Sequence, residues 1–264
     1  MSDPRRTRKD PTASSLYVQS VEKAMKVLTA FDGSKRHLSL SEIAGLADMD
    51  ISAAQRFTHT LSTLGYLTKG ADKKYELSPR LLDFTFHYLS SSELVNRAAP
   101  YLQQLSSETE EATNLTVMDG TDIVYVVRIV SRHVFNANVI VGSRLPAWCT
   151  APGQAILSTY ADDEVDDILD RSELIAYTPA TVTDRDQVWE NIRRARQRRY
   201  AHVEDQFFYG DTSTAAAIVD ASGRGIGAVN VAVTRARWNA ERDEKRMADL
   251  LISTAAAISA KRKG

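Results

Sequence analysis

The sequence predicts an α+β protein of two domains: a winged helix-turn-helix, a linker helix, and an α/β domain built on an antiparallel sheet. Its length of 264 residues suits two domains of ordinary size. Three short amphipathic helices and then a hairpin occupy the first 78 residues, which is the element order of a winged helix-turn-helix. Beyond residue 97, strand-like runs come in hairpins with helices at their flanks, which is typical of an α+β domain.

Composition and charge narrow the class of protein. The chain is 43% hydrophobic and 25% charged, as ordinary soluble proteins are. Its single cysteine, Cys149, excludes an intrachain disulfide and indicates a reducing cytoplasm. No signal peptide and no bilayer-spanning run is found, so we expect no membrane partner. Residues 1–80 carry 13 Lys and Arg against 9 Asp and Glu, whereas residues 81–264 carry 20 against 25, and a basic front favours a nucleic-acid module.

The chain opens with a polar, basic segment over residues 1–15, which predicts a disordered arm. It could touch DNA phosphates, although solvation alone also explains its charges. A helix is expected after Ser20, which can cap it, with apolar residues from Val21 to Phe31 at helical spacing. Gly33 ends that helix.

Two shorter helices follow. Ser39 and Glu42 have the spacing of a capping box, as do Ser52 and Gln55. The buried face of the first of these helices is predicted at Ile43, Ala44, Leu46 and Ala47. That of the second is predicted at Ala54, Phe57, Leu61 and Leu64. The polar residues of the second helix therefore point away from the core, where they could read base edges in a major groove.

A hairpin with a basic tip completes the array, with strands expected at 66–69 and 74–77. Arg56 could read guanine and Gln55 adenine, while the hairpin lysines would bind phosphates. The residues predicted to contact double-stranded operator DNA are Ser41, Ser52, Gln55, Arg56, His59, Thr60, Lys69, Lys73 and Lys74. The alternative for each of these residues is that it lies on a solvent-exposed face and does not bind DNA.

A fourth helix is expected from Ser78, its cap, and Pro79 at its first position. Apolar residues surround this helix, so we expect it and the first helix to be covered in a dimer. The run Ser90–Ser92 indicates a hinge. The predicted division is an arm over 1–15, a winged helix-turn-helix over 16–78, a linker helix over 79–96 and a second domain over 97–264.

The second domain alternates between strands and helices. A helix is expected from Pro100 to Glu111, and a loop over 142–150. Strands are predicted at 113–119, 122–130, 134–141, 200–208, 213–220 and 225–234. Further helices are predicted at 152–160, 162–170, 185–199 and 239–262.

Four stretches carry a family resemblance over nearly the whole chain. They are YVQSVEKAMKVLTAF and LSLSEIAGLADMDISAAQRFTHTLSTLGYL at the front, GSRLPAWCTAPGQAIL at 142–157, and YAHVEDQFFYGDTSTAAAIVDASGRGIGAVNVAV at 200–233. The sequence resembles the IclR family of bacterial regulators, and its GSRLPAWCTA form is similar to members that govern protocatechuate and 4-hydroxybenzoate catabolism. It departs from the family pattern at Ala54, Pro152, Gln206 and Ala217.

The resemblance implies a transcriptional regulator that binds operator DNA as a homodimer, or as a tetramer if the second domains also pair. It further implies a GAF-like second domain that takes a small effector, here an aromatic or short-chain carboxylic acid. No metal or cofactor is implied.

The local sequence suggests where the effector would bind. Thr150 can cap a helix that starts at Pro152, and the amides of Gly153, Gln154 and Ala155 would then be free to hold a carboxylate. The predicted effector residues are Trp148, Cys149, Thr150, Ala151, Gly153, Gln154, Thr212, Ser213 and Thr214, to which the family resemblance adds Asn230, at a position that often faces the pocket. Weaker candidates on the first hairpin are Asn114, Thr116, Tyr125 and Arg128.

Two other functions stay open. The second domain could be an enzyme with Cys149 as nucleophile, although no histidine spacing suggests an activating base and no metal-ligand motif occurs. The chain could also be a DNA-binding protein without a ligand, in which case the second domain would have a filled core. Trp148 could be a packed loop residue, and Cys149 a small buried hydrophobe.

Overall fold

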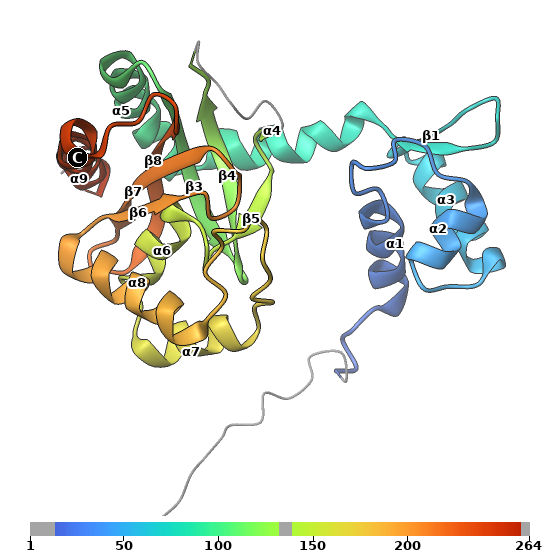
Figure 1. Ribbon diagram of the computed structural model, residues 1–264. Helices are drawn as coiled ribbons and strands as arrows, with labels where there is room; N and C mark the ends of the chain where they lie inside the picture. The colour runs from blue at the N-terminus through green and yellow to red at the C-terminus, as the bar shows by residue number, and fades with distance from the viewer. Residues whose placement is uncertain (1–13, 132–138, 260–264) are drawn as a thin grey trace, which may run out of the picture. The chain divides into compact units, whose positions relative to one another are not determined.

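The computed structural model describes residues 14–131 and 139–259 (Figure 1). Contacts divide the chain into a first unit that ends at Tyr88 and a second unit that begins at Leu89. Most of the predicted arm, residues 1–13, lies outside the described residues. Among the described residues, no helix combines the length and the apolar character that crossing a bilayer requires.

The first unit has the predicted order of three helices and a hairpin, so the winged helix-turn-helix is confirmed. The helices are α1 (Gln19–Thr29), α2 (Leu40–Leu46) and α3 (Ile51–Thr63), and the hairpin pairs β1 (Leu67–Lys69) with β2 (Tyr75–Leu77). Leu38 also bridges to Tyr75, which ties the segment before α2 to the hairpin. The core of this unit is small: Val27, Leu38, Ile43, Ala47, Leu61, Leu67 and Tyr75.

Helix capping follows the prediction at α2 and departs from it at α1 and α3. The hydroxyl of Ser39 accepts from the Glu42 amide at 3.3 Å, and the Ser39 amide donates to the Glu42 carboxylate at 3.0 Å, so the capping box is confirmed. The Ser39 amide, together with the Ser39 hydroxyl that donates to the same carboxylate at 2.9 Å, lowers the pKa of Glu42 to about 2. The caps predicted at Ser20 for α1 and at Ser52 for α3 are wrong.

Helix α1 begins after Val18, which makes no side-chain cap, so Ser20 is an ordinary helical residue. Helix α3 is capped by Asp50, whose carboxylate accepts from the Ala53 amide at 2.7 Å. A cap needs extended backbone, and Asp50 has it whereas Ser52 is already inside the helix.

Burial in the first unit also differs from the apolar pattern. Leu46 and Leu64 were expected in the core but are 61% and 51% exposed. Thr58 is buried instead. Its hydroxyl tolerates burial because it donates a hydrogen bond to the Ala54 carbonyl at 2.8 Å within the helix. On α1 the buried residue is Val27, while Val21 and Met25 of the predicted stripe are exposed in the single chain.

The linker is two helices that meet at the predicted serine run. Ser78 caps a short 3₁₀ turn, η2 (Pro79–Leu81), which leads into α4 (Leu82–Ser91). Ser92 then caps α5 (Glu93–Thr109) through the Val95 amide. The helix that we expected to start at Pro100 therefore starts seven residues earlier, and Pro100 lies inside it. Proline lacks only one helical hydrogen bond, and packing of α5 on the sheet outweighs that loss.

The second unit is a six-stranded antiparallel sheet with helices on both faces, which confirms the α+β prediction (Figure 1). The strand order is β5-β4-β3-β8-β7-β6. Its strands are β3 (Ala112–Asp119), β4 (Asp122–Ile129), β5 (Arg144–Pro146), β6 (Ala201–Glu204), β7 (Asp211–Val219) and β8 (Gly225–Thr234). One apolar core joins the sheet to α5 and α9 (Ala240–Ser259). The other joins it to α6 (Ala151–Leu157), α7 (Asp162–Asp170) and α8 (Arg185–Arg198).

Two predicted strands are corrected. The strand expected at 134–141 falls partly outside the described residues, and 139–141 form no strand, whereas β5 lies in the predicted loop. The strand expected at 200–208 ends at Glu204, because Asp205 has a positive φ of 55°, which extended pairing does not allow.

A β-bulge decides which side chains of β4 share a face. Leu115 pairs with Val127 and Thr116 with Tyr125, so Val126 has no partner on β3. The extra residue shifts the alternation and places Tyr125 and Arg128 on the same face. Both line a cavity in the second unit, while Val126 packs into the core on the opposite face.

Candidate DNA-binding surface and effector cavity

The polar face of α3 is exposed to solvent in the part of the chain that the structure describes. Ala54, Thr58 and Leu61 are buried against the first unit, and the predicted readers on the other face are all exposed: Gln55, Arg56, His59 and Thr60. The hydroxyl of Thr60 donates to the Arg56 carbonyl at 2.9 Å. The helix therefore presents an amide, a guanidinium and an imidazole in one stripe, which are groups that bind base edges and phosphates.

The remaining predicted DNA contacts are exposed as well. Lys73 and Lys74 lie at the tip of the hairpin, and the Lys69 ammonium lies 5.3 Å from the centre of the Tyr75 ring. Ser41 and Ser52 are exposed near the starts of α2 and α3. All nine predicted residues are thus available on the first unit, which is the arrangement that phosphate and base contact requires.

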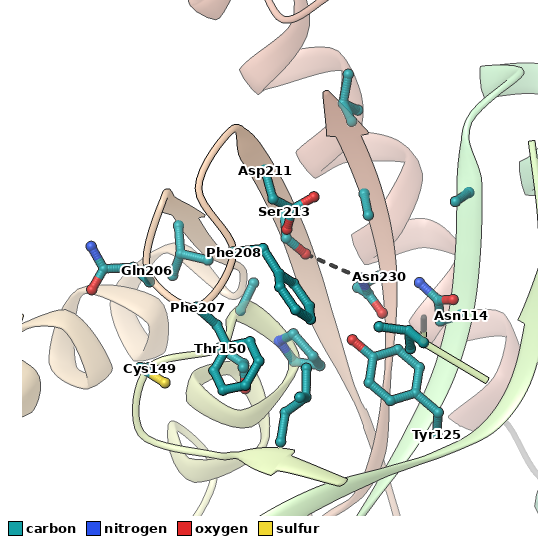
Figure 2. Close-up of a pocket in the computed structure, with 18 of the residues that line it drawn as sticks. Asn114, Tyr125, Cys149, Thr150, Gln206, Phe207, Phe208, Asp211, Ser213 and Asn230 are labelled. Carbon is teal, nitrogen blue, oxygen red and sulfur yellow. Dashed lines mark hydrogen bonds between the residues drawn. The ribbon is translucent and has the colours of Figure 1, made fainter. Parts of the chain in front are cut away.

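The second unit holds a cavity of about 680 Å³, counted with its open mouth, between the sheet and the start of α6. Figure 2 shows Thr150 and Phe207 on one side of it and Asn114 and Tyr125 on the other. Its apolar wall includes Leu145, Pro152, Val203, Phe207, Phe208 and Ala232. A concave, largely apolar space with a few polar groups is the usual form of a small-molecule site.

The polar wall of the cavity lies on the sheet. The Arg128 guanidinium donates to the Asn114 side-chain oxygen at 3.0 Å, and the Asn230 amide nitrogen donates to the Ser213 hydroxyl at 3.1 Å. Burial lowers the pKa of Arg128, yet a guanidinium stays charged at any physiological pH, so the cavity holds a cation. Burial raises the pKa of the Tyr125 phenol, which therefore remains a neutral hydroxyl.

Asp211 also lines the cavity, at the start of β7. Burial raises the pKa of its carboxyl to about 7, with a further contribution from the charge of Asp205, and the charge of Arg128 opposes the rise. The net charge of the cavity therefore changes near neutral pH.

This pKa predicts a pH effect on stability that an isosteric variant isolates. The raised pKa means that the folded protein holds a proton that the unfolded chain releases near pH 3.8, so stability is lost as pH rises from about 4 through 7. Asp211→Asn, which copies the protonated form, should not suffer this loss. The excess of its melting temperature over that of the wild type should grow from pH 5 to pH 8 at constant ionic strength. Asp163→Asn, on the exposed surface of α7, is the control, and a constant difference for Asp211→Asn would contradict the assignment.

The start of α6 differs from the prediction. Thr150 occupies the cap position, but its hydroxyl donates to the Pro146 carbonyl at 2.9 Å and caps no amide. The Gln154 amide is not free, because it donates to the Thr150 carbonyl at 2.9 Å. The Ala155 amide falls within the regular bonding of the helix. The amides of Ala151 and Gly153 donate to no residue that the structure describes, and of these two only Ala151 lines the cavity.

Gly153 serves packing and not ligand approach. A Cβ at this position would overlap the Ala147 carbonyl oxygen and Cα, and would lie 2.6 Å from the Ala147 carbonyl carbon. The first turn of α6 thus presses directly on the loop backbone that follows β5.

The cavity gathers about half of the predicted effector residues. Those that line it are Cys149, Thr150, Ala151, Ser213 and Asn230, together with Asn114, Tyr125 and Arg128 from the first hairpin. Those that do not line it are Trp148, Gly153, Gln154, Thr212, Thr214 and Thr116. Thr212 and Thr214 alternate with Ser213 along β7 and so point to the other face, where Thr214 bonds His202 at 2.9 Å.

Trp148 and Gln154 hold the loop together. The Gln154 side chain donates to the Trp148 carbonyl at 3.0 Å, and the Trp148 ring lies 6.3 Å from that of Tyr177. Trp148 is therefore a packed loop residue, the alternative considered for it from the sequence.

The cavity is also lined by residues that were not predicted from the sequence: Asp211, Phe207, Phe208 and Gln206. Alternation from Ser213 could have found Asp211, which lies two residues away on the same face. Nothing local marks the phenylalanines, because they belong to a loop that folds over the sheet. Gln206 holds that loop: its side chain accepts from the Val182 amide at 2.9 Å and donates to the Ala180 carbonyl at 2.8 Å.

Cys149 has the surroundings of a buried thiol. Burial raises its pKa to about 12, and its sulfur lies 3.9 Å from the Pro146 carbonyl oxygen. A nucleophile must be a thiolate, and a thiol with this pKa is protonated at neutral pH. The geometry therefore gives the enzyme hypothesis no support.

An exposed recognition helix with a basic wing, joined to a second unit with a small-molecule cavity, defines a ligand-responsive DNA-binding protein. Residues 20–71 match the model of the IclR helix-turn-helix domain, and residues 86–260 match the model of the bacterial transcriptional regulator IclR C-terminal region. The chain belongs to the IclR family of bacterial transcriptional regulators.

Characterised relatives and a solved structure agree with this family. The Pca regulon regulatory protein of Pseudomonas putida is 32% identical over 238 residues, covering 90% of this chain and 81% of that protein. The p-hydroxybenzoate hydroxylase transcriptional activator of Acinetobacter baylyi is 29% identical over 220 residues, covering 81% of this chain and 80% of that protein. In fold, the chain is similar to an IclR homolog complexed with 4-hydroxybenzoate from Microbacterium hydrocarbonoxydans, with a TM-score of 0.76 at 21% identity, covering 91% and 97% of the two chains.

Proposed function

We propose that a small aromatic carboxylic acid, bound in the cavity of the second unit, controls how tightly this regulator binds its operator. The observation that carries the proposal is the cavity itself, in which an apolar wall with two phenylalanines faces the half-buried guanidinium of Arg128. Phenyl rings provide a stacking surface for an aromatic ring, and Arg128 compensates the charge of an acid.

We propose how such an acid would lie against the lining residues. Phe207, Phe208 and Pro152 would enclose the ring. The carboxylate would lie at the start of α6, against the Ala151 amide, within the field of Arg128. Two relatives support an aromatic ligand: one is named for p-hydroxybenzoate hydroxylase, and one was crystallised with 4-hydroxybenzoate.

The assembly that binds DNA is proposed to be a dimer formed through the first unit and the linker. Helix α4 exposes Leu82, Phe84, Phe86 and Tyr88, and α1 exposes Val21 and Met25. Large apolar side chains in such number on one monomer indicate an interface. Two recognition helices would then act on the two halves of a palindromic site, and pairing of the second units would give a tetramer.

The proposal is tested by pairing a binding assay with a DNA assay. Benzoate and its hydroxylated derivatives should raise the melting temperature of the protein, and the best of them should change its affinity for DNA from its own promoter by about fivefold or more. Straight-chain acids of equal charge serve as the comparison. Ala232→Leu, which fills the cavity from β8, should keep DNA binding and lose the response to acid. If no acid alters either quantity, a ligand-free DNA-binding protein becomes the better description.

A further inference from the structure

The polar wall of the cavity contains a row of hydrogen-bonding side chains that is interrupted at one point. In the sheet register Arg128 of β4 pairs with Asn114 of β3, and Asn114 pairs in turn with Asn230 of β8. All three line the cavity, and so does Ser213 on the next strand, β7. Ser213 lies diagonally from Asn230, because it pairs with Ala232, and the row of polar side chains thus extends over four neighbouring strands.

Hydrogen bonds connect the residues at each end of the row, but none connects Asn114 to Asn230 in its middle. Arg128 donates to the Asn114 oxygen, and because a guanidinium can only donate, this bond fixes which way the Asn114 amide faces. Asn230 donates to Ser213 at the other end (Figure 2). The Asn114 nitrogen and the Asn230 oxygen remain without a partner among the described residues.

Both unpartnered atoms belong to deeply buried side chains. Asn114 is 1% exposed and Asn230 is 2% exposed, so bulk water does not satisfy them. Buried amide groups in native proteins nearly always have a partner, and an exception calls for an explanation. Figure 2 shows these two side chains near Tyr125, on the side of the cavity opposite Thr150.

The two free atoms are a donor and an acceptor on directly paired residues of adjacent strands. A hydroxyl group is their complement, because its oxygen accepts from Asn114 while its hydrogen is donated to Asn230. A carboxylate would leave the Asn230 oxygen without a donor, and a ring C–H would satisfy neither atom. The next row of the sheet in the cavity carries Ala112, Ala232 and Ser213, and the small alanine side chains leave room beside the pair.

We propose that Asn114 and Asn230 bind a hydroxyl group of the effector, so that the cavity selects a hydroxylated aromatic acid over the same acid without the hydroxyl. The inference rests on the proposed function, since it assumes that an aromatic acid enters the cavity. It adds that Asn114 and Asn230 recognise the hydroxyl substituent, and it assigns the end of the ligand that they contact. With the carboxylate at the start of α6, the hydroxyl lies at the far end of the ring.

The test measures a ratio of affinities by titration calorimetry on the full chain. Benzoate, 3-hydroxybenzoate and 4-hydroxybenzoate are each titrated into the wild type, Asn114→Asp and Asn230→Ala. Asn114→Asp keeps an oxygen for Arg128 but has no amide donor, and Asn230→Ala removes the acceptor. We expect the wild type to bind one hydroxylated acid at least about tenfold more tightly than benzoate. Either variant should reduce that ratio to below about threefold, mainly by weakening the hydroxylated acid.

Thr212→Val is the matched control. Thr212, on β7, also has a buried hydroxyl with no partner in the described part of the chain, but it does not line the cavity, so this isosteric change should leave the ratio as in the wild type. Circular dichroism checks the fold of every variant, and the two asparagine variants test the pair independently.

Two results would overturn the inference while the proposed function stands. In the first, wild-type protein binds benzoate as tightly as both hydroxybenzoates, which would mean that water fills the gap. In the second, the hydroxylated acid keeps its advantage in both asparagine variants. If none of the three acids binds at all, the proposed function fails first and the inference falls with it.

Discussion

Gly153→Ala is expected to destabilise the second unit by about 3 kcal/mol or more, among the largest effects of any single methyl group in this protein. The cause is collision and not backbone strain, because this glycine has no positive φ. Its Cβ would overlap backbone atoms of Ala147, which cannot rotate aside as a flexible side chain can. Relief would require α6 to move away from the loop, and Ala151 and Pro152 at its start line the cavity.

Thermal or urea unfolding of the purified variant checks this expectation. The control is Gly45→Ala on α2, where a Cβ meets nothing within 4 Å. Alanine is a better helix former there and should raise stability by about 0.5–1 kcal/mol. A Gly153→Ala protein that melts like the wild type and still binds an aromatic acid would show that the packing of α6 on Ala147 is incorrect.

Arg56→Ala should weaken binding to operator DNA by about 10- to 100-fold, the range for loss of one bidentate contact with a base. Arg56 lies on the exposed face of α3 beside Gln55, and its own side chain is not used to hold the first unit together. Melting temperature and the response of the second unit to aromatic acids should therefore be unchanged. Fluorescence anisotropy with labelled promoter DNA at fixed salt measures the loss.

The control for charge is Arg194→Ala, which removes an exposed arginine from α8 in the second unit. It changes the net charge equally and should leave operator affinity close to that of the wild type. Equal losses in the two variants would mean that general electrostatic attraction, and not α3, accounts for binding. An Arg56→Ala protein that also lost its response to acids would contradict the separation of the two tasks.

Local sequence signals predicted the order of helices and strands in the first unit, but they predicted its helix caps and buried residues only in part. The Ser39–Glu42 box could be predicted because both partners lie within one turn of a helix. The same spacing at Ser52 and Gln55 was misleading, because Asp50 already stood in the extended backbone that a cap needs. Leu46 and Leu64 fit the helical period but are exposed, since a core of seven side chains covers only part of each helix.

Only some of the residues that line the cavity were predicted from the sequence, because the direction of a side chain depends on strand register and on packing between distant segments. Ser213 was predicted together with Thr212 and Thr214, of which alternation along β7 brings only Ser213 into the cavity, and Asn230 was predicted from the family resemblance. Tyr125 and Arg128 could not both be placed with certainty, because they face the same way only through the bulge at Val126. Gly153 was assigned to the ligand, whereas its lack of a side chain is required by the backbone of Ala147.

The sequence by itself determined the order of helices and hairpins, the α+β class, the exposed polar stripe of α3 and the resemblance to one family, because each depends on neighbours a few residues apart or on motif identity. Only the tertiary structure decided which polar groups meet in the cavity. Asn114, Asn230 and Asp211 come from three strands, and Phe207 comes from a loop that folds over them. Their meeting depends on strand register and on one unpaired residue, and no local pattern in the chain encodes these.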